Sequence, residues 1–506
     1  MAIEKAPYLI YSEQVSTVNY GTSTGADVLA IIAPTKFGKY NSEGNVETEI
    51  LYHLEVYSES AGTTLVGNCT CKLVADESTT HIKLQVTESD AQAITVGTNY
   101  FVVKTAKTDG SLVYELFTDA GTTSASKYAK VSAETVTKWY EPTVSEDEIL
   151  IFNRYSVAEQ MIQSSEVKKV LKEFFLENSY YSADDNLGVN SVLVIPIPTT
   201  TTGTGQNTIP HPNVDDFKDA YKLLRKFRRV NAIGLIGVSN PQNIGVTLKQ
   251  YLVEDQERGV LRIAYIKAPE RGSDETVTAY ATRIANICQT HNEVISGDTT
   301  QVEGVNSSRI CLVEPTHYGT LLAKICNTEY YLEPGYLPIN SLSIGEFDIL
   351  SDDERDKLCM SGLIFGEDDV ILPVTVPRIC LGVSTSFGRP YSENATGYES
   401  RLADSLLHAR RNVDHHVREV LSILAYQIKR NETSVNLTYL KNQVMNYFEK
   451  ELGNGTIMAY SFNVTESQYN PYCLLVTGEI VPVNSTLAIK FNNYIEAPYN
   501  IASNYV

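Results

Sequence analysis

Residues 472–494 read YCLLVTGEIVPVNSTLAIKFNNY and predict a pair of β-strands joined by a short turn. Residues 472–481 are mostly apolar, which is typical of a strand buried on both faces. Residues 486–494 alternate instead, and one side of that strand presents Leu487, Ile489 and Phe491. We take this pair as the centre around which the C-terminal quarter of the chain folds.

Two amphipathic helices precede the pair. Apolar residues recur at helical spacing from Glu399 to Lys429 and again from about Asn436 to Leu452. After Tyr494 the chain continues to Val506 with no helix pattern and no cap. An extended segment of this kind either frays or adds as a strand to another chain, and we expect it to dock on a second copy of this protein.

Composition limits the classes of function. The chain has 506 residues, which is too long for one hydrophobic core, and a formal net charge of −20. Because phosphate binding needs a basic surface, the charge argues against nucleic acid as the main partner. Tyrosine is abundant, with 32 residues against 14 Phe and 1 Trp, and Tyr is favoured at protein interfaces.

The sequence also gives expectations about the compartment. The start of the chain does not resemble a signal peptide, and no apolar run is long enough to span a bilayer. The eight cysteines are scattered, mostly within apolar runs, as buried free thiols would be. We therefore expect synthesis in a reducing cytoplasm and no direct insertion into a membrane.

Alternating patterns divide the rest of the chain. Residues 43–146 are rich in Thr, Val and Ser, and Asp109-Gly110 predicts a hairpin turn, so we expect an inserted all-β surface domain there. Buried-strand patterns alternate with helical ones through residues 147–375, with one long helix from about Ser156 to Asn178 and another from Val214 to Arg228. This alternation predicts a mostly parallel sheet covered on both faces. Residues 343–369 are acidic and are expected to be turns.

The predicted fold class is multidomain α/β, α+β overall. It has a mostly parallel α/β core, the inserted all-β domain, and a C-terminal α+β domain with extended arms at both ends of the chain. The predicted boundaries are an arm at 1–25, a first core strand at 26–42, the insertion at 43–146, the core at 147–375, the C-terminal polymerisation domain at 376–484, and a last strand and arm at 485–506.

Catalytic and metal-binding patterns are weak throughout. The GTGQNT stretch from Gly203 lacks the third glycine of a dinucleotide loop, and no P-loop, nucleophile elbow or zinc-protease motif is present. Cys69 and Cys71 lack two further zinc ligands at a suitable spacing. His317 follows a predicted strand, as catalytic groups of α/β enzymes do, but has no partner motif. We expect no catalytic residue, metal or cofactor.

One helix carries a charge pattern opposite to that of the whole chain. Between His408 and Arg430 the basic residues are Arg410, Arg411, Arg418, Lys429 and Arg430. These residues form either an ordinary solvated helix face or a docking face for an acidic partner.

The order of these segments resembles the tail sheath proteins of contractile phages and related contractile injection systems. The stretch GTSTGADVLAIIAPTKFG, residues 21–38, looks like the family's N-terminal arm entering its first core strand. Residues 148–178, which end in FFLEN, look like the family's strand, helix and "FF-x-N" segment, with the Asn one residue later. Residues 437–462 and 474–495 look like its C-terminal domain, and only 43–146 lies outside the resemblance.

The resemblance implies a structural and non-enzymatic function. Sheath subunits stack as hexameric rings around a tail tube, and contraction drives the tube through the host envelope. Implied partners are further copies of the chain, the tail tube protein, and baseplate and tail terminator proteins. The implied location is the virion tail, made and assembled in the host bacterial cytoplasm.

Strand exchange between copies follows from the resemblance and from the free arms together. The expected intersubunit strands, which would pair near Tyr472–Val481 of other copies, comprise Tyr8, Leu9, Ile10, Tyr11, Leu487, Ile489, Phe491, Tyr494 and Ile495. The basic helix becomes a candidate for docking on the tube, and a chain without residues 45–145 is expected to polymerise.

Two other classes of protein stay open on the sequence alone. An α/β enzyme with a β accessory domain would show a pocket with perturbed titratable groups. Another self-assembling virion protein, such as a capsid or adhesin-like protein, would form shells or fibres instead of rings around a tube.

Overall fold

The computed structural model describes residues 27–58, 64–78, 81–90, 94, 96–106, 112–117, 127–182, 191–198, 200–202, 209–211, 214–238, 241–296, 309–336, 338–371, 374–380, 407–425, 434–466 and 474–483. The chain divides into two compact units. One comprises Lys36–Pro142 and Ser156–Ser164, and the other comprises the remainder of the chain. Each unit is described separately below.

An eight-stranded sheet forms the centre of the larger unit, in the order β16-β15-β14-β13-β12-β1-β9-β8. The six strands from β15 to β9 run parallel, and β16 and β8 pair antiparallel at the two edges. The strands are β1 (Leu29–Pro34), β8 (Leu150–Phe152), β9 (Val192–Ile197), β12 (Ala232–Leu235), β13 (Ile263–Lys267), β14 (Ile310–Val313), β15 (Leu363–Ile371) and β16 (Val374–Cys380). Strand β1 lies in the middle of the sheet and is buried along its whole length, as its continuous apolar run predicts.

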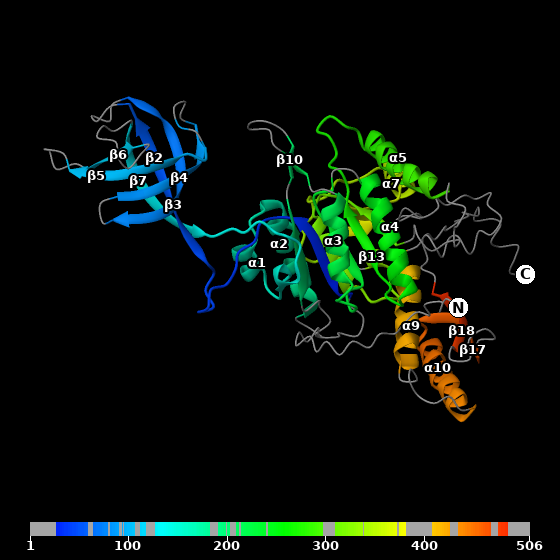
Figure 1. The fold of residues 1–506 in the computed structure, drawn as a ribbon. Coiled ribbons are helices and arrows are strands. Elements are labelled where there is room, and N and C mark those ends of the chain that lie inside the picture. The colour runs from blue at the N-terminus through cyan, green and yellow to red at the C-terminus, as the bar shows by residue number, and fades with distance from the viewer. Residues whose placement is uncertain are drawn as a thin grey trace, which may run out of the picture. The chain divides into compact units, whose positions relative to one another are not determined.

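Helices cover both faces of this sheet (Figure 1). The helices α3 (Val214–Leu224), α4 (Pro241–Glu257), α5 (Val277–Ser296) and α7 (Asp352–Ser361) share one apolar core with alternate residues of the strands. On the opposite face, the Tyr318 hydroxyl of α6 (Tyr318–Asn327) donates to the carbonyl of Tyr265 in β13, and α2 (Ser165–Ser182) packs on α6. This unit also contains a small hairpin and two short 3₁₀ helices: β10 (Thr200–Thr202), β11 (Ile209–His211), η1 (Glu146–Glu148) and η2 (Pro334–Tyr336). The core is therefore a three-layer α/β/α domain.

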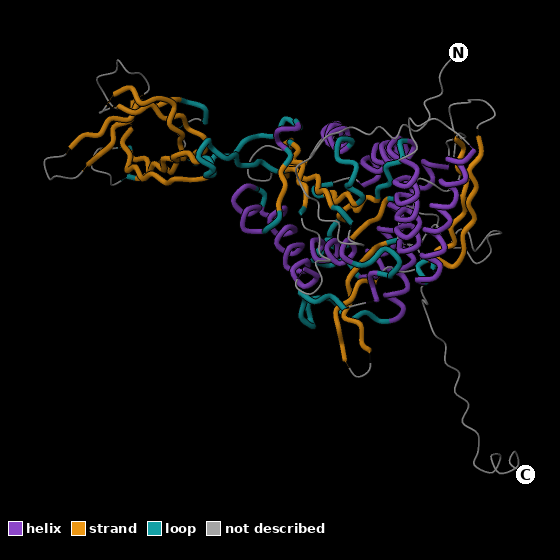
Figure 2. The backbone as a smooth tube through the Cα atoms, turned by 90° about the horizontal axis from the view of Figure 1, so that it is seen from below, coloured by secondary structure: helices purple, strands orange, loops and turns teal. Residues whose placement is uncertain are grey.

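The smaller unit is a closed barrel of six antiparallel strands, which Figure 2 shows as a ring. Its strands are β2 (Thr48–Tyr57), β3 (Leu65–Ser78), β4 (His81–Ser89), β5 (Asn99–Ala106), β6 (Leu112–Phe117) and β7 (Lys127–Thr137). The predicted hairpin is present as the antiparallel pair β5–β6. Alternate residues of every strand, such as Leu54, Leu84 and Val102, fill the interior. The insertion is thus an all-β domain with a core of its own.

The chain enters and leaves the barrel at one place. The backbones of Phe37 and Tyr140 donate a hydrogen bond to each other, over 3.1 and 2.9 Å. Phe37 also pairs with Ile162, just after α1 (Tyr155–Met161). The helix predicted from Ser156 to Asn178 is therefore wrong as one element, because residues 162–164 leave the helical path to pair here and α2 begins only at Ser165.

The C-terminal part consists of α9 (Leu407–Ala425), α10 (Ser434–Asn454) and the antiparallel pair β17 (Ile457–Glu466) and β18 (Leu474–Pro482). Val444 and Phe448 of α10 pack with Val420 of α9 and Ile457 of β17 in a small core. Both predicted helices are present, within the described residues. The predicted strand pair 472–481 with 486–494 is not testable there, because residues 486–494 lie outside them, and β18 pairs with β17.

Three other expectations are corrected by the structure. Residues 343–369 are not only turns, because α7 and the start of β15 lie within them. Helix α3 ends at Leu224, four residues before the predicted end. Strand β18 is not buried on both faces, since Thr477, Gly478 and Glu479 are exposed.

Candidate assembly surface

Strands β17 and β18, here called the C-terminal hairpin, present one packed face and one exposed face. Tyr460, Phe462 and Ile480 pack against the core shared with α10. The residues between them face the solvent, and across the two strands they pair as Ala459 with Val481, Ser461 with Glu479, and Asn463 with Thr477. The two strands form a sheet of their own, so among the described residues each strand has an edge with no strand beside it. Such an edge offers backbone donors and acceptors to an added strand.

The C-terminal hairpin and α10 carry exposed apolar side chains. Met458 is 59% exposed at the bulge in β17, and Val481 is 44% exposed on β18. The outer side of α10 adds Tyr439, Met445 and Leu452, each more than 40% exposed. Large exposed apolar side chains on neighbouring elements are typical of surfaces that bind another protein.

A buried ion pair anchors α9 to the first core strand. Arg411 is 2% exposed, and its Nε lies 2.9 Å from Oδ2 of Asp27, just before β1. Nη2 of Arg411 donates to the carbonyl of Thr328 at 2.6 Å, and Asn231 donates to the second Asp27 oxygen. Because a buried charge is tolerated only with partners, these contacts fix the position of α9 on the core.

A second buried pair lies one helical turn further along α9. Arg309, at the start of β14, contacts Asp414 through both terminal nitrogens, one of them at 2.8 Å from Oδ1. Arg410 lies 3.7 Å from the same carboxylate. Burial alone would raise the pKa of Asp414, but the guanidinium groups of Arg309 and Arg410 hold that pKa below its ordinary value. Asp414 therefore stays charged and binds α9 to the middle of the sheet.

Aromatic rings complete the joint between α9, α10 and the core. The His415 ring stacks on Tyr330, with centroids 3.6 Å apart, and His416 hydrogen-bonds the Tyr447 hydroxyl on α10. Burial lowers the pKa of His415 to about 3 and that of His416 to about 4, and nearby Arg418 contributes to the shift of His415. Both imidazoles are neutral at physiological pH, as stacked and buried rings must be.

The structure brings together only part of the predicted docking set. Arg411 is buried inside the unit and paired with Asp27, and Arg410 pairs with Asp414. Arg418 is half-buried and donates to the carbonyl of Leu261 at 3.5 Å. Lys429, Arg430 and all nine predicted intersubunit strand residues lie outside the described residues.

The residues weighed for catalysis have structural surroundings. His317 begins α6 in a left-handed conformation, with its two ring nitrogens 3.6 Å from Glu173 and 3.4 Å from Glu346. The hydrogen bond to Glu173 raises its pKa. Cys69 and Cys71 point into the closed barrel and are buried. Within the ranges that the structure describes, no group of three or more His, Cys, Asp or Glu can hold a metal ion.

Comparison with known proteins gives similarity in structure alone. No protein-family model matches the chain, and no curated protein matches it in sequence. The chain is similar to a chain of the anti-feeding prophage baseplate, with 9% identity and a TM-score of 0.45 over 69% of this chain and 88% of that one. It is also similar to a chain of the contracted sheath complex of PVC, an extracellular contractile injection system. That match has 10% identity and a TM-score of 0.46, over 69% of this chain and 88% of the other. The chain thus resembles components of contractile injection systems in structure.

The sequence did not identify the residues that hold α9 in place. Asp27, Arg309 and Asp414 are single polar residues at the ends of apolar runs or on a polar helix face. The one available signal is a charged residue directly beside a buried strand, as at Asp27 and Arg309. Such a residue needs a partner because it enters the core with its strand.

Proposed function

We propose that the chain is the sheath subunit of a contractile tail. Copies polymerise as stacked hexameric rings around an inner tube, with baseplate and terminator proteins at the ends, and contraction of the rings drives the tube through the host envelope. The subunit works as a structural part of the virion tail or of a related injection device, and not as an enzyme. It assembles in the bacterial cytoplasm.

The observation that carries the proposal is the C-terminal hairpin. Its inner face is packed on α10, its outer face and strand edges are open among the described residues, and apolar side chains surround it. The segments before residue 27 and after residue 483 are long enough to add strands to this hairpin in a neighbouring copy. Buried ion pairs at Arg411 and Asp414 hold α9 against the core. A force applied to the hairpin is therefore transmitted through α9 to the sheet.

Exchange of strands suits a lattice that must stay connected while its subunits move. Main-chain hydrogen bonds of an added strand are kept as the flanking segments bend, whereas a rigid side-chain interface breaks when subunits slide.

Among the described residues, none of the helices has the length and apolar character needed to cross a membrane.

Truncation of the arms tests the proposal. Full-length chain and chains without residues 1–20 or 485–506 are purified, and polymers are viewed by negative-stain electron microscopy with the tube protein present. We expect tubes of uniform width from the full chain only. The matched controls keep the length of each arm but replace it with Gly and Ser, and they too should fail. Truncated chains that still form long tubes would show that the arms do not connect the subunits.

The hairpin itself offers a second test. Ala459 and Val481 face each other on the exposed side, and changing both to Arg leaves the packed face untouched. We expect loss of tubes with an unchanged circular dichroism spectrum. The control changes Lys218 and Lys222 on α3 to Glu, which alters charge without altering the hairpin. Equal loss in the control would indicate a general effect of charge.

Docking of the inner tube is proposed for Arg418 of α9 together with Lys429 and Arg430, which follow α9 in the sequence and lie outside the described residues. Arg411 and Arg410 are paired with carboxylates inside the unit, whereas Arg418 is half-buried and donates to a backbone carbonyl. The proposal therefore rests on Arg418, Lys429 and Arg430. Changing these three residues to Glu should abolish co-sedimentation of the tube while rings still form. Co-sedimentation at the level of the unaltered chain would remove this assignment.

A further inference from the structure

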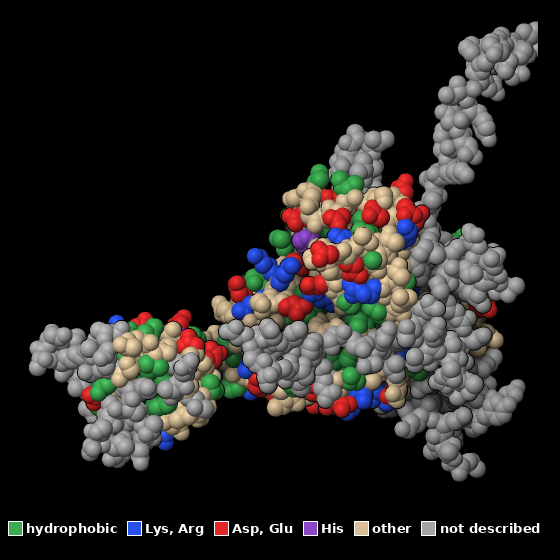
Figure 3. Space-filling model, turned by 90° about the horizontal axis from the view of Figure 1, so that it is seen from above, with side chains coloured by type: hydrophobic (Ala, Val, Ile, Leu, Met, Phe, Trp, Pro, Cys, Tyr) green, Lys and Arg blue, Asp and Glu red, His purple; other side chains and the backbone are tan. Residues whose placement is uncertain are grey.

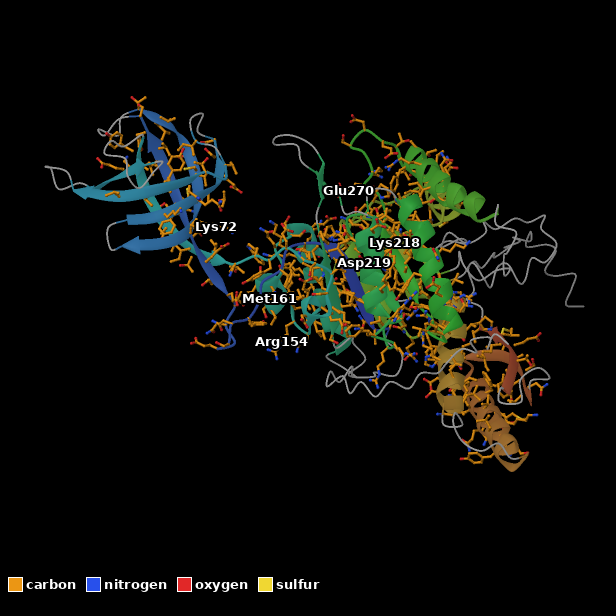
Figure 4. All side chains as sticks on the ribbon, in the orientation of Figure 1. Lys72, Arg154, Met161, Lys218, Asp219 and Glu270 are labelled. Atoms are coloured by element: carbon orange, nitrogen blue, oxygen red, sulfur yellow. The ribbon has the colours of Figure 1, made fainter. Side chains whose placement is uncertain are left out.

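The two edges of the parallel sheet carry opposite charge. The edge at which the parallel strands begin is here called the basic edge, and the edge at which they end the acidic edge. Figure 4 shows the two labelled examples, Arg154 and Glu270, at opposite ends of the core. Arg154 follows β8, which runs antiparallel to its neighbour and so ends at the basic edge. Glu270 follows β13 and lies at the acidic edge.

The basic edge is assembled from turns that a buried arginine fixes together. Arg228 and Arg229 follow α3, and Arg258 follows α4. Arg262 is 1% exposed and donates to the carbonyls of Leu224, Phe227 and Val230, over 2.8 to 3.0 Å, while it also contacts Asp255. This one side chain therefore ties the turn after α3 to the turn after α4. Arg228, Arg229 and Arg258 lie in these two turns, so their backbones are fixed relative to each other.

The surface arginines of the basic edge lie at or near the solvent. Arg154, Arg229 and Arg258 are exposed and Arg228 is half-buried. None of the four forms an ion pair with a carboxylate of the described residues, whereas Arg225 and Lys226 beside them are paired with Glu254 and Glu146. The whole chain has a net charge of −20, so a group of arginines without ion pairs on one edge gives that edge a charge opposite to that of the chain. Arg is also the cation most enriched in protein interfaces.

The acidic edge combines carboxylates with exposed apolar side chains. Glu270 and Asp274 lie in the loop after β13. Asp352 and Asp353 open α7 with 98 and 76% of their side chains exposed, and each forms an ion pair within the helix, with Arg355 and Lys357 respectively. Ile344 and Ile349, both more than 60% exposed, lie in the loop before α7. The salt bridge between Arg271 and Asp348 joins the two loops. Figure 3, which views the core from this side, shows Asp and Glu side chains spread over the face with fewer Lys and Arg between them.

We propose that the acidic edge of one copy binds the basic edge of a second copy. The inference rests on the proposed function in that the partner is another copy of the chain, and it names a second interface of the polymer besides the arms. The two edges are different surfaces, so the contact is head to tail and leaves one edge of each kind free at the ends. Such a contact continues indefinitely as a stack or closes as a ring. Complementary charge would also set the orientation in which copies meet.

Charge reversal and mixing test the proposal in the full-length chain. One variant carries Arg228→Glu and Arg229→Glu, and the other carries Asp352→Lys and Asp353→Lys. Association is followed by sedimentation velocity at about 0.05 M and about 0.5 M salt. Exposed charges further apart than the Debye length are screened, and this length falls from about 14 Å to about 4 Å between the two salt concentrations. The unaltered chain should associate at low salt and less at high salt. In each variant alone, the two reversed side chains meet like charges of the neighbouring copy, so the variant should stay dispersed.

A mixture of the two variants is the decisive sample. Its acidic edges meet basic edges again in an alternating order, so we expect association to return to the level of the unaltered chain. Lys218→Glu with Lys222→Glu, on the outer side of α3 and at neither edge, is the matched control and should associate normally. Variants that associate like the unaltered chain, or a mixture that stays dispersed, would overturn the inference.

Further readouts separate folding, other partners and the proposed function. These charges also lie near helix ends, where they interact with helix dipoles, so the melting temperature of each variant is measured. If a double variant does not fold, Arg258→Glu and Asp274→Lys repeat the design in exposed turns. Binding of duplex DNA by the basic edge at the same salt would overturn the choice of partner. If tubes form despite charge reversal at the edges, the proposed contact between the edges is wrong, but the proposed sheath function is unaffected. If copies associate head to tail and never form tubes, the contact between the edges is supported and the sheath function is wrong.

Discussion

Removal of Asp27 should weaken the larger unit much more than an ordinary surface change. In Asp27→Ala the guanidinium of Arg411, which is 2% exposed, loses its carboxylate and remains buried. Breaking a buried pair on one side costs about 3–5 kcal/mol. With a urea slope of about 3 kcal/mol per molar for a unit of this size, the midpoint should fall by about 1–2 M.

The single tryptophan provides a built-in control for this measurement. Trp139 belongs to the smaller unit, so its fluorescence reports on the barrel, whereas circular dichroism at the helix band reports mainly on the larger unit. We expect Asp27→Ala to shift the dichroism transition and leave the fluorescence transition in place. A common shift of both transitions would mean that the two units unfold together.

A double variant completes the argument about Asp27. Replacing Asp27 by Ala and Arg411 by Met removes both charges, and the loss of stability should shrink by more than half, because no unpaired charge is left. A single variant as stable as the unaltered chain, or a double variant no better than the single, would refute the view that this ion pair holds α9 on the core.

Two further predictions concern pH and packing. His416 is neutral in the folded chain, with its pKa lowered by burial from 6.5 to about 4, so stability should be full above pH 6.5 and fall as pH drops toward 4. The fall for this group is on the order of 3 kcal/mol, and His416→Phe should lessen it in urea midpoints compared between pH 7 and pH 4.5. In Gly319→Ala the added Cβ would lie 2.0 Å from the carbonyl oxygen of Val170, so we expect a loss of about 3 kcal/mol or more by denaturation. Gly453→Ala, where nothing lies within 4 Å of the added Cβ, is its control and should not lose stability.

Apolar periodicity was sufficient to predict most strands of the parallel sheet and several of the helices. The run around Ile31 and Ile32 is a buried parallel strand because only a strand covered on both faces is apolar throughout. Leu84 and Val86 alternate with polar neighbours, so successive side chains of this strand point into and out of the barrel. In both cases the pattern reflects burial of one strand and needs no knowledge of distant residues.

Elements that depend on end signals or on distant partners were missed. Helix α7 has few apolar residues, and its best signal is the capping box of Ser351 and Glu354 with Gly362 in left-handed conformation at the other end. The break at Ile162 depends on Phe37, which is 125 positions earlier in the chain. Local propensity contains no information about such a contact.

The candidate assembly surface was located only in outline. The sequence shows the basic residues of α9, but a polar residue that faces solvent and one that faces a buried partner look alike in sequence. Arg411, Asp414 and His416 are all buried, and their partners come from β1, β14 and α10. The burial of β18 was misread because an apolar run was taken to need cover on both faces, whereas its outer face is exposed.

The paired backbones of Phe37 and Tyr140 make the barrel exchangeable. Because the chain closes this base with hydrogen bonds of its own, the core receives the same two strand ends whatever lies between them. Residues 41–137 can therefore be replaced by a short linker, or by a foreign domain whose termini lie close together, without changing the path of the chain through the sheet. A polymer of such subunits would display the foreign domain at every position of its lattice. The same junction gives evolution a site at which the domain can be gained, lost or replaced while the α/β/α core is retained.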